Sequence, residues 1–386
     1  MKQNKKICLL ALILPLLCLL LLFPAYAEED ETMPTEQIPD EFSDLLAALP
    51  DDLLALLPDG IFSSDSAEVG SAARQMSDFS YLLQTLLSLV GMRLGDALTV
   101  LASICGLLIL SAIFRAFRSS IGSEGVGRAF AFCSTLVITL ALLRESYRSL
   151  GGVVDYLSTL SHITLAAIPL LGALYAMGGN VSAAVASSGG LAVYMTVLEE
   201  LVGKSVIPFC GICMALALIG ALDPALRTGM LSSTLKKNYT TALSFLMMLL
   251  LAMLASQTTL GAKGDSLTMR SVKFAAGNLI PVVGGSVSEL LRTVSAGVGY
   301  LRGTVGICGT LLLALTLLPT LVELLLLRGV WQLSASLAEM LGCDNEKRLL
   351  EEFSSLLGYL IAAVSICSSV LLLALTLLTH CASAIG

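Results

Sequence analysis

Long apolar runs dominate this sequence and restrict what it can fold into. Of its 386 residues, 56% are hydrophobic and only 13% are charged. A helical run of about 20 apolar residues matches a ~30 Å hydrocarbon core, and a soluble domain does not carry such runs repeatedly. The sequence therefore predicts an all-α, polytopic helical membrane protein.

About eight segments are apolar and long enough to be membrane spans, with a range of six to eight. The second segment is short for a full crossing. The fourth is rich in Ser and Gly, which allow helices to approach closely in lipid. The expected spans are 98–114, 129–143, 157–177, 181–198, 205–222, 240–260, 303–327 and 356–379.

The first 27 residues have the pattern of an export signal. Lysines precede an apolar run, and "AYA" at 25–27 fits a cleavage site that acidic residues follow. We expect cleavage after Ala27, with an uncleaved first span as the alternative. The sequence then divides into a signal peptide (1–27), an acidic extracytoplasmic segment with short amphipathic helices (28–95) and a multi-spanning membrane domain (96–386).

A tandem repeat of eight residues lies in the acidic segment: "DLLAALPD" at 44–51 is followed by "DLLALLPD" at 52–59. Each proline stops a helix after about two turns, and isolated helices of that length are unstable in water. The repeat therefore predicts docking to a partner or to the membrane surface, or else a flexible spacer.

Basic residues near the span ends indicate the orientation of the chain. If the signal is cleaved, the first span runs inward. The cytoplasmic side then carries Arg115, Arg118, Arg128, Arg227, Lys236, Lys237, Arg328, Lys347 and Arg348. The opposite side also receives basic residues, so the bias is weak.

The segment 273–297, "KFAAGNLIPVVGGSVSELLRTVSAG", is interrupted by Pro281 and by Gly284-Gly285. Its apolar residues predict two amphipathic half-helices around a break. Non-helical backbone at membrane depth must be buried in protein or line a watery cavity, and broken helices commonly build transporter sites. We therefore expect either a broken or re-entrant pair, with Asn278, Pro281, Gly284 and Gly285 as functional or pore-lining residues, or an interfacial pair lying on the bilayer.

Residue patterns for catalysis are absent from the sequence, since it has no H-E-x-x-H, Walker A or G-x-S-x-G motif. Cys210 and Cys213 form a C-x-x-C inside an expected span, without a second pair or a nearby His, which predicts small buried cysteines. We expect no enzyme activity, cofactor or metal.

Glu323 is the candidate functional charge because apolar runs flank it, although Arg328 is near enough to place Glu323 close to the cytoplasmic interface.

The stretch "GDSLTMRSVKFAAGNLIPVVGGSVSELLRTVSAGVGYLRGTVGICG" at 264–309, together with "AAIPLLGALYAMGGNVSAA" at 166–184 and the exported acidic segment, resembles the stage III sporulation protein AE family of endospore-forming bacteria. The likeness covers most of the chain from about residue 157. It implies a multi-pass subunit of the complex that joins mother cell and forespore after engulfment, located in the mother-cell-derived outer forespore membrane.

The partners that the resemblance implies are other proteins of the stage III sporulation A operon, including an ATPase and ring-forming subunits, and a forespore membrane protein. Contact with the lipid bilayer is expected and contact with nucleic acid is not. Within a channel or secretion complex the chain would have a permease-like or a scaffold role. The alternative is a general small-molecule or ion permease unrelated to sporulation. Water-accessible positions around Gly284-Gly285 would favour transport, and a dry site would favour a scaffold.

Overall fold

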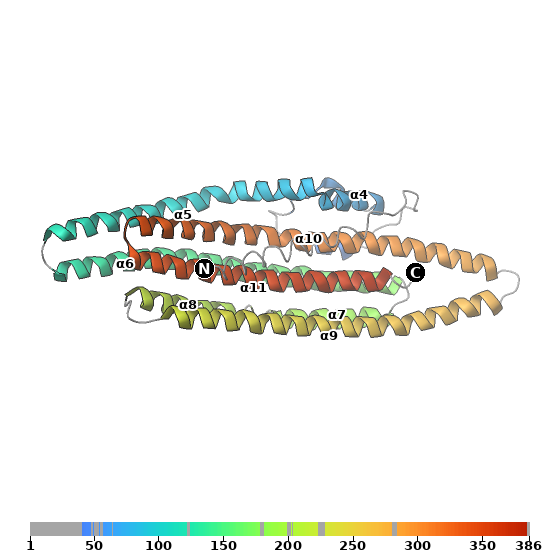
Figure 1. Ribbon diagram of the computed structural model, residues 1–386. Coiled ribbons are helices and arrows are strands. Elements are labelled where there is room, and N and C mark those ends of the chain that lie inside the picture. The colour runs from blue at the N-terminus through green and yellow to red at the C-terminus, as the bar shows by residue number, and fades with distance from the viewer. Residues whose placement is uncertain are drawn as a thin grey trace.

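The structure is an elongated bundle of long helices (Figure 1). It is a computed structural model that describes residues 41–47, 49, 54, 57–63, 65–121, 124–177, 181–198, 202, 204–222, 228–279 and 284–383. The long helices in this part of the chain are α5 (Phe79–Ile121), α6 (Glu124–Met177), α7 (Val181–Val197), α8 (Lys204–Leu222), α9 (Thr228–Leu279), α10 (Gly284–Met340) and α11 (Asp344–Ser383).

The predicted fold class, an all-α membrane protein, is confirmed. Among the described residues, five helices are long and apolar enough to cross a membrane; they are parts of α5, α6, α8, α10 and α11. Helices α5, α6, α9, α10 and α11 are longer than a bilayer requires, whereas α7 and α8, with 17 and 19 residues, are not. At a rise of about 1.5 Å per residue, the 57 residues of α10 extend for about 86 Å, so a large part of that helix lies outside a ~30 Å hydrocarbon core.

Two expected spans, 129–143 and 157–177, are parts of one continuous helix, α6. The segment between them contains Gly151 and Gly152 but no proline, so nothing forces the helix to end there. It also buries Leu150, Val153 and Tyr156 against other helices. Burial of this face stabilises a continuous helix between the two expected spans.

The helices alternate in direction along the bundle, except that α7 and α8 run the same way. The turns α5–α6, α8–α9 and α10–α11 lie at one end, and the α9–α10 turn lies at the other (Figure 1). α7 and α8 follow one another along α9, so the fourth and fifth expected spans form one interrupted rod. The three turns at the first end belong to the segments that the basic residues assigned to the cytoplasm.

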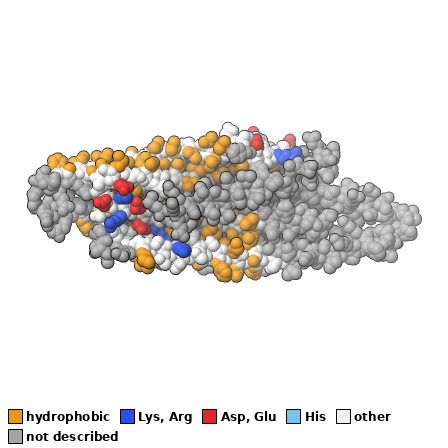
Figure 2. Space-filling model, in the orientation of Figure 1, with side chains coloured by type: hydrophobic (Ala, Val, Ile, Leu, Met, Phe, Trp, Pro, Cys, Tyr) orange, Lys and Arg blue, Asp and Glu red, His pale blue; other side chains and the backbone are white. Residues whose placement is uncertain are grey.

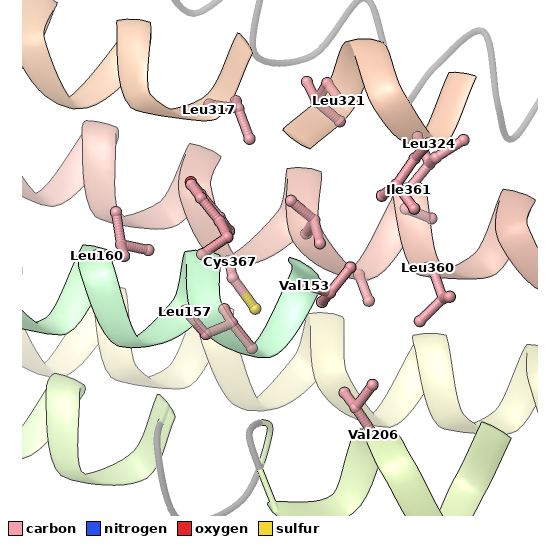
Figure 3. Packing of buried hydrophobic residues seen from close by; sticks show 14 of the residues in the cluster. Val153, Leu157, Leu160, Val206, Leu317, Leu321, Leu324, Leu360, Ile361 and Cys367 are labelled. Atoms are coloured by element: carbon pink, nitrogen blue, oxygen red, sulfur yellow. The ribbon is translucent and has the colours of Figure 1, made fainter. Parts of the chain in front are cut away.

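Helix α11 lies at the centre of the bundle. Of its apolar window, 78% is buried inside the protein, against 17% for that of α5. In Figure 3, Leu360, Ile361 and Cys367 of α11 lie between side chains of α10 on one side and of α6 and α8 on the other. The labelled neighbours are Leu317, Leu321, Leu324, Val153, Leu157, Leu160 and Val206. α11 is therefore the core helix, and α5 is free to face lipid.

The turn between α10 and α11 depends on Gly342, whose φ of 70° is rarely accessible to other residues. The Cys343 N–H donates to the Ala338 carbonyl at 2.8 Å, and the Gly342 N–H donates to the Glu339 carbonyl at 3.0 Å. This pair of bonds is a Schellman motif, which satisfies the last carbonyls of α10. It lets α11 begin two residues later and pack antiparallel to α10.

The acidic segment packs on the bundle instead of standing free. Its described elements are α2 (Glu41–Ala47), η2 (Asp59–Phe62) and α4 (Ser66–Ser77). α2 contacts α6, α4 contacts α10, and their apolar side chains are buried, among them Phe42, Leu46, Ile61, Val69 and Met76. The chain's own helices thus supply a surface for the short helices. The expected boundary at 95/96 lies within α5, and the predicted signal peptide lies outside the described residues.

Hydrophobic side chains are also abundant on the surface. Figure 2 shows them along α5 at one edge and along the α8–α9 edge opposite, while charged side chains gather near the start of α11. Exposed examples are Phe117 of α5, Ile212 of α8 and Phe245 of α9. Exposed apolar patches of this extent are typical of a protein that contacts lipid or other membrane proteins.

Candidate functional site

Three charged side chains are almost fully buried among the described residues: Lys236 of α9, Arg328 of α10 and Glu346 of α11, which are 1%, 8% and 4% exposed. Charged groups are rarely buried because they lose hydration. In a membrane protein, a charge kept among apolar helices is by default a functional candidate. We therefore take the region where α9, α10 and α11 meet as the candidate site.

Lys236 is held by Glu352 of α11. Its Nζ lies 3.1 Å from Glu352 Oε2 and donates to the Glu352 main-chain carbonyl at 3.3 Å. Ser232, one turn earlier on the same face of α9, donates to Oε2 at 3.2 Å. The carboxylate thus receives two hydrogen bonds from α9, which offsets part of the cost of removing both charges from water.

Aromatic residues surround this ion pair. The Lys236 ammonium lies 6.0 Å from the centre of the Tyr359 ring, at the outer limit of a cation–π contact. One turn along α9, the Tyr239 ring stacks on Phe209 of α8 at 4.2 Å, and its hydroxyl shares a 2.8 Å hydrogen bond with Ser205. These contacts fix α9 against α8 and α11, and so fix the position of the lysine.

Arg328 packs on α11 at Gly358. A Cβ at that position would lie 2.9 Å from the guanidinium carbon, which is closer than real Cβ atoms come to other atoms. Only glycine leaves room for the planar guanidinium to lie against the helix backbone. The glycine of α11 therefore sets how deep the arginine enters the bundle.

Glu346 is held from a third helix, α5. Ser111 of α5 donates to Glu346 Oε1 at 3.1 Å. Glu346 is in the first turn of α11, where the helix dipole favours a carboxylate. The buried acid therefore joins the start of α11 to α5.

Farther along α11, tyrosine hydroxyls make buried polar contacts. The Tyr194 hydroxyl of α7 donates to the Cys367 carbonyl at 2.7 Å, and the Tyr156 hydroxyl of α6 shares a 2.6 Å hydrogen bond with Ser368. Together with Glu346 and Glu352, these residues form a row of polar contacts along the core helix. Each contact joins α11 to a different neighbour, so the row fixes its rotation within the bundle.

A second group of charges lies on the other side of α10, between α10, α5 and α6. Its members line a shallow pocket of about 40 Å³: Arg93 and Asp96 of α5, Glu145 and Arg148 of α6, and Glu323 of α10. The Arg93–Glu323 distance is 3.8 Å, and Arg148 lies 4.0 Å from Asp96 and 3.9 Å from Glu145. We call this the α5–α6–α10 charge cluster. Its side chains are 22–66% exposed, so bilayer headgroups, water or a partner can reach them.

The structure thus gives Glu323 four charged neighbours instead of an isolated position among apolar residues. Arg328 is buried and faces Gly358 of α11. Lys236, which lies between two expected spans, is part of α9 and is buried inside the bundle, where its ion pair with Glu352 offsets part of the cost of burial. The cytoplasmic side assigned to these residues stays a prediction.

The predicted break lies between α9, which ends at Leu279, and α10, which begins at Gly284. Asn278 is in the last turn of α9, Gly284 and Gly285 open α10, and Pro281 lies outside the described residues. The two helices continue past the end of α11 and meet there (Figure 1). The predicted break therefore lies between two helices that approach each other at one end of the molecule, and a functional or pore-lining role for these residues stays a prediction.

Cys210 and Cys213 are free, buried thiols in α8, which agrees with the prediction of small buried cysteines. The sequence did not single out the Lys236–Glu352 pair or Gly358. A weak signal was present: Ser232 and Lys236 are four residues apart, which places both on one face of α9. Nothing local in the sequence indicated that their partner lies 116 residues further along.

Comparisons with known proteins agree with this architecture. A family model described as stage III sporulation protein AE matches residues 68–382. The chain is similar to the stage III sporulation protein AE of Bacillus subtilis (strain 168), with 27% identity over 300 residues that cover 78% of this chain and 73% of the relative. No solved structure matches the chain.

Proposed function

Because the chain belongs to the stage III sporulation protein AE family, we propose that it is a membrane subunit of the channel or secretion complex that joins mother cell and forespore. A sporulation role follows from the family. We further propose that the chain lies in the mother-cell-derived outer forespore membrane. The proposed partners are other proteins of the stage III sporulation A operon, including the ATPase and ring-forming subunits, and a forespore membrane protein.

A permease-like role is the one that the buried charges favour. A protein that only holds partners together gains little from an ion pair inside its helices, since apolar residues of similar size stabilise a core at least as well. Lys236 and Glu352 lie where three long helices meet, and their pairing fixes the relative position of α9 and α11. A change in that pairing would move these helices against each other, as solute passage through a bundle requires.

The length of the helices favours a scaffold role as the second candidate. α9 and α10 form a hairpin that extends beyond the end of α11 (Figure 1), and such a projection can contact other subunits outside the bilayer. Asn278, Pro281, Gly284 and Gly285 would then shape the tip of this hairpin instead of lining a pore. We propose no catalytic activity for either role.

Deletion of the gene tests whether the protein is required for sporulation. Sporulation should stop after engulfment, while vegetative growth should remain normal. The measurement is spore yield and forespore morphology beside the growth rate. A growth defect of similar severity would instead indicate a general permease unrelated to sporulation.

Two adjacent serines of α9 distinguish the permease-like role from the scaffold. Ser232 faces Glu352 and is buried, whereas Ser233 is exposed. In sporulating cells, the Ser232→Cys variant should react with a small water-soluble thiol reagent if the site is hydrated. The reaction should be faster than in vegetative cells, which lack the complex. Cys at 233 is the matched control. If Cys at 232 stays unreactive while Cys at 233 reacts, the scaffold role is favoured.

A further inference from the structure

The α5–α6–α10 charge cluster surrounds a cavity, and its charges do not balance. Each of the three helices contributes one carboxylate to the lining: Asp96 from α5, Glu145 from α6 and Glu323 from α10. The two guanidiniums of the lining are those of Arg93 and Arg148. Three negative and two positive charges leave the lining with a net charge of −1, so the cavity favours a cation.

The two arginines leave the carboxylates free to bind a further group. Arg93 lies 3.8 Å from Glu323, and Arg148 lies 4.0 Å from Asp96 and 3.9 Å from Glu145. A charge-assisted hydrogen bond between nitrogen and oxygen is about 2.7–2.9 Å long, so these ion pairs are too long to contain one. Each carboxylate therefore keeps oxygen lone pairs that can accept hydrogen bonds from a ligand.

The size and lining of the cavity suit an alkylammonium group. Its volume is about 40 Å³, and a cavity of about 10–15 Å³ already holds one water molecule, so an –NH₃⁺ group and the carbon that carries it fit. Apolar side chains, including Val100 and Leu327, complete the lining and can contact that carbon. The described residues include no group of three or more His, Cys, Asp or Glu side chains placed to hold a metal ion, which favours an organic cation. A primary ammonium has three N–H donors, one for the carboxylate of each helix.

Exposure differs within the cluster and gives a bound molecule its direction. The Glu145 and Glu323 side chains are 22% and 33% exposed, so they form the inner part of the cavity. The Asp96 and Arg148 side chains are 66% and 59% exposed, so they form its rim. An ammonium bound inside would leave the rest of its molecule at the rim, where the guanidinium of Arg148 suits a phosphate.

The cavity lies beside an apolar surface of α5. Met92, Leu94 and Leu98, which precede and follow the charged residues of this helix, are 58%, 42% and 53% exposed. Exposed apolar residues of this size are typical of a surface that contacts lipid. A soluble amine needs no such surface around its site, whereas a lipid places its acyl chains there.

We propose that the α5–α6–α10 charge cluster binds the headgroup of an aminophospholipid, phosphatidylethanolamine, from the surrounding bilayer. The ammonium donates to Glu145 and Glu323 inside the cavity and to Asp96 at its rim. The phosphate lies at the exposed rim beside Arg148, and the acyl chains lie along α5. The site goes beyond the proposed sporulation role and does not depend on it, because three helices of this chain form the whole cavity.

Native mass spectrometry of the full-length protein in detergent measures this binding, because each retained lipid adds a fixed mass. The protein is titrated with phosphatidylethanolamine and, separately, with its N-monomethyl, N,N-dimethyl and trimethyl forms, the last of which is phosphatidylcholine. Methylation removes N–H donors one at a time and keeps the positive charge, the phosphate and the acyl chains. We expect binding to weaken at each step, and phosphatidylcholine to bind about tenfold more weakly than phosphatidylethanolamine.

Variants assign this selectivity to the cluster. Glu145→Gln removes an inner carboxylate and should bring the ratio of the two affinities close to one. Asp96→Asn, at the rim, should lower the ratio by a smaller factor. Arg148→Gln should weaken both lipids alike and leave the ratio unchanged. Glu339→Gln is the matched control, because Glu339 is an exposed acid of α10 that pairs with Lys347 and does not line the cavity; it should titrate like the wild type.

Two further ligands identify the source of the ammonium. Phosphoethanolamine lacks acyl chains and hexadecylamine lacks the phosphate, so each should displace phosphatidylethanolamine only at concentrations more than about tenfold higher. If hexadecylamine competes as well as the lipid itself, the cavity binds amines in general and the headgroup assignment is wrong.

The proposal fails if the wild type binds phosphatidylethanolamine and phosphatidylcholine alike. It also fails if phosphatidylglycerol, which has no ammonium, binds more tightly than phosphatidylethanolamine, because the arginines would then determine the ligand. If Glu145→Gln does not accumulate, Asp96→Asn decides, since its side chain is largely exposed and the variant should fold. An unchanged affinity ratio in Asp96→Asn would then overturn the assignment.

Discussion

The two groups of charges on different sides of α10 contain the same kinds of residue but differ in how deeply the cation is buried. In the α5–α6–α10 charge cluster, the Arg93 and Glu323 side chains are 37% and 33% exposed and 3.8 Å apart. On the other side, the Lys236 side chain is 1% exposed and lies 3.1 Å from Glu352, whose side chain is 30% exposed. Exposed pairs contribute little because solvent screens them, whereas breaking a buried pair leaves a charge without compensation. The burial of Lys236, and not the kind of charged residue, therefore distinguishes the Lys236–Glu352 pair from the exposed α5–α6–α10 charge cluster.

The largest effect should follow from Glu352→Gln. The amide keeps a hydrogen-bond acceptor for Ser232 but leaves the buried Lys236 ammonium uncompensated. We expect a loss of about 3–5 kcal/mol in the free energy of unfolding, with strongly reduced spore yield. The measurements are the thermal unfolding midpoint of the purified protein and its abundance in membranes.

The double variant Lys236→Met with Glu352→Gln controls for this loss. It removes both charges, so most of the stability should return. If spore yield stays low while abundance recovers, the charges themselves act in function. Equal instability of the single and double variants would show that packing, and not charge, dominates at this position.

An intermediate effect should follow from Glu346→Gln. This acid is buried and forms no ion pair with the described residues; it accepts a hydrogen bond from Ser111 and lies in the first turn of α11. The amide keeps the hydrogen bond and loses the interaction with the helix dipole, which is typically about 0.3–1 kcal/mol. The same thermal unfolding assay measures this difference. A loss as large as that of Glu352→Gln would mean that burial alone, without a partner cation, sets the cost.

The smallest effect should follow from Glu323→Gln in the α5–α6–α10 charge cluster. An ion pair this exposed contributes about 0–1 kcal/mol, so unfolding should change little. Arg93→Gln is the matched control from the other side of the pair. Spore yield distinguishes a structural from a functional role: if it falls in both variants while stability and abundance hold, the cluster is a contact for a partner or an ion.

The membrane helices and the family could be predicted from the sequence, but the connections between the helices could not. Apolar runs predicted helices at positions that α5 to α11 occupy, because hydrophobicity and length are local properties. The segment 144–156 lay between two expected spans and is helical, because its buried residues, such as Val153 and Tyr156, pack against other helices. Gly342 was not singled out, because a glycine that caps a helix looks like any other until its φ is known.

What the sequence by itself determined is the class of protein: enough apolar length for a membrane bundle, and a pattern specific enough to identify the stage III sporulation protein AE family. Only the tertiary structure decided which charged residues are buried and which residues they pair with. Lys236 and Glu352 meet because the faces of α9 and α11 that carry them are turned toward each other. The two residues are 116 positions apart in the sequence, so the rotation that brings them together depends on how the intervening helices pack. The physical reason is that hydrophobicity acts on each segment alone, whereas an ion pair requires two segments to be placed within about 4 Å.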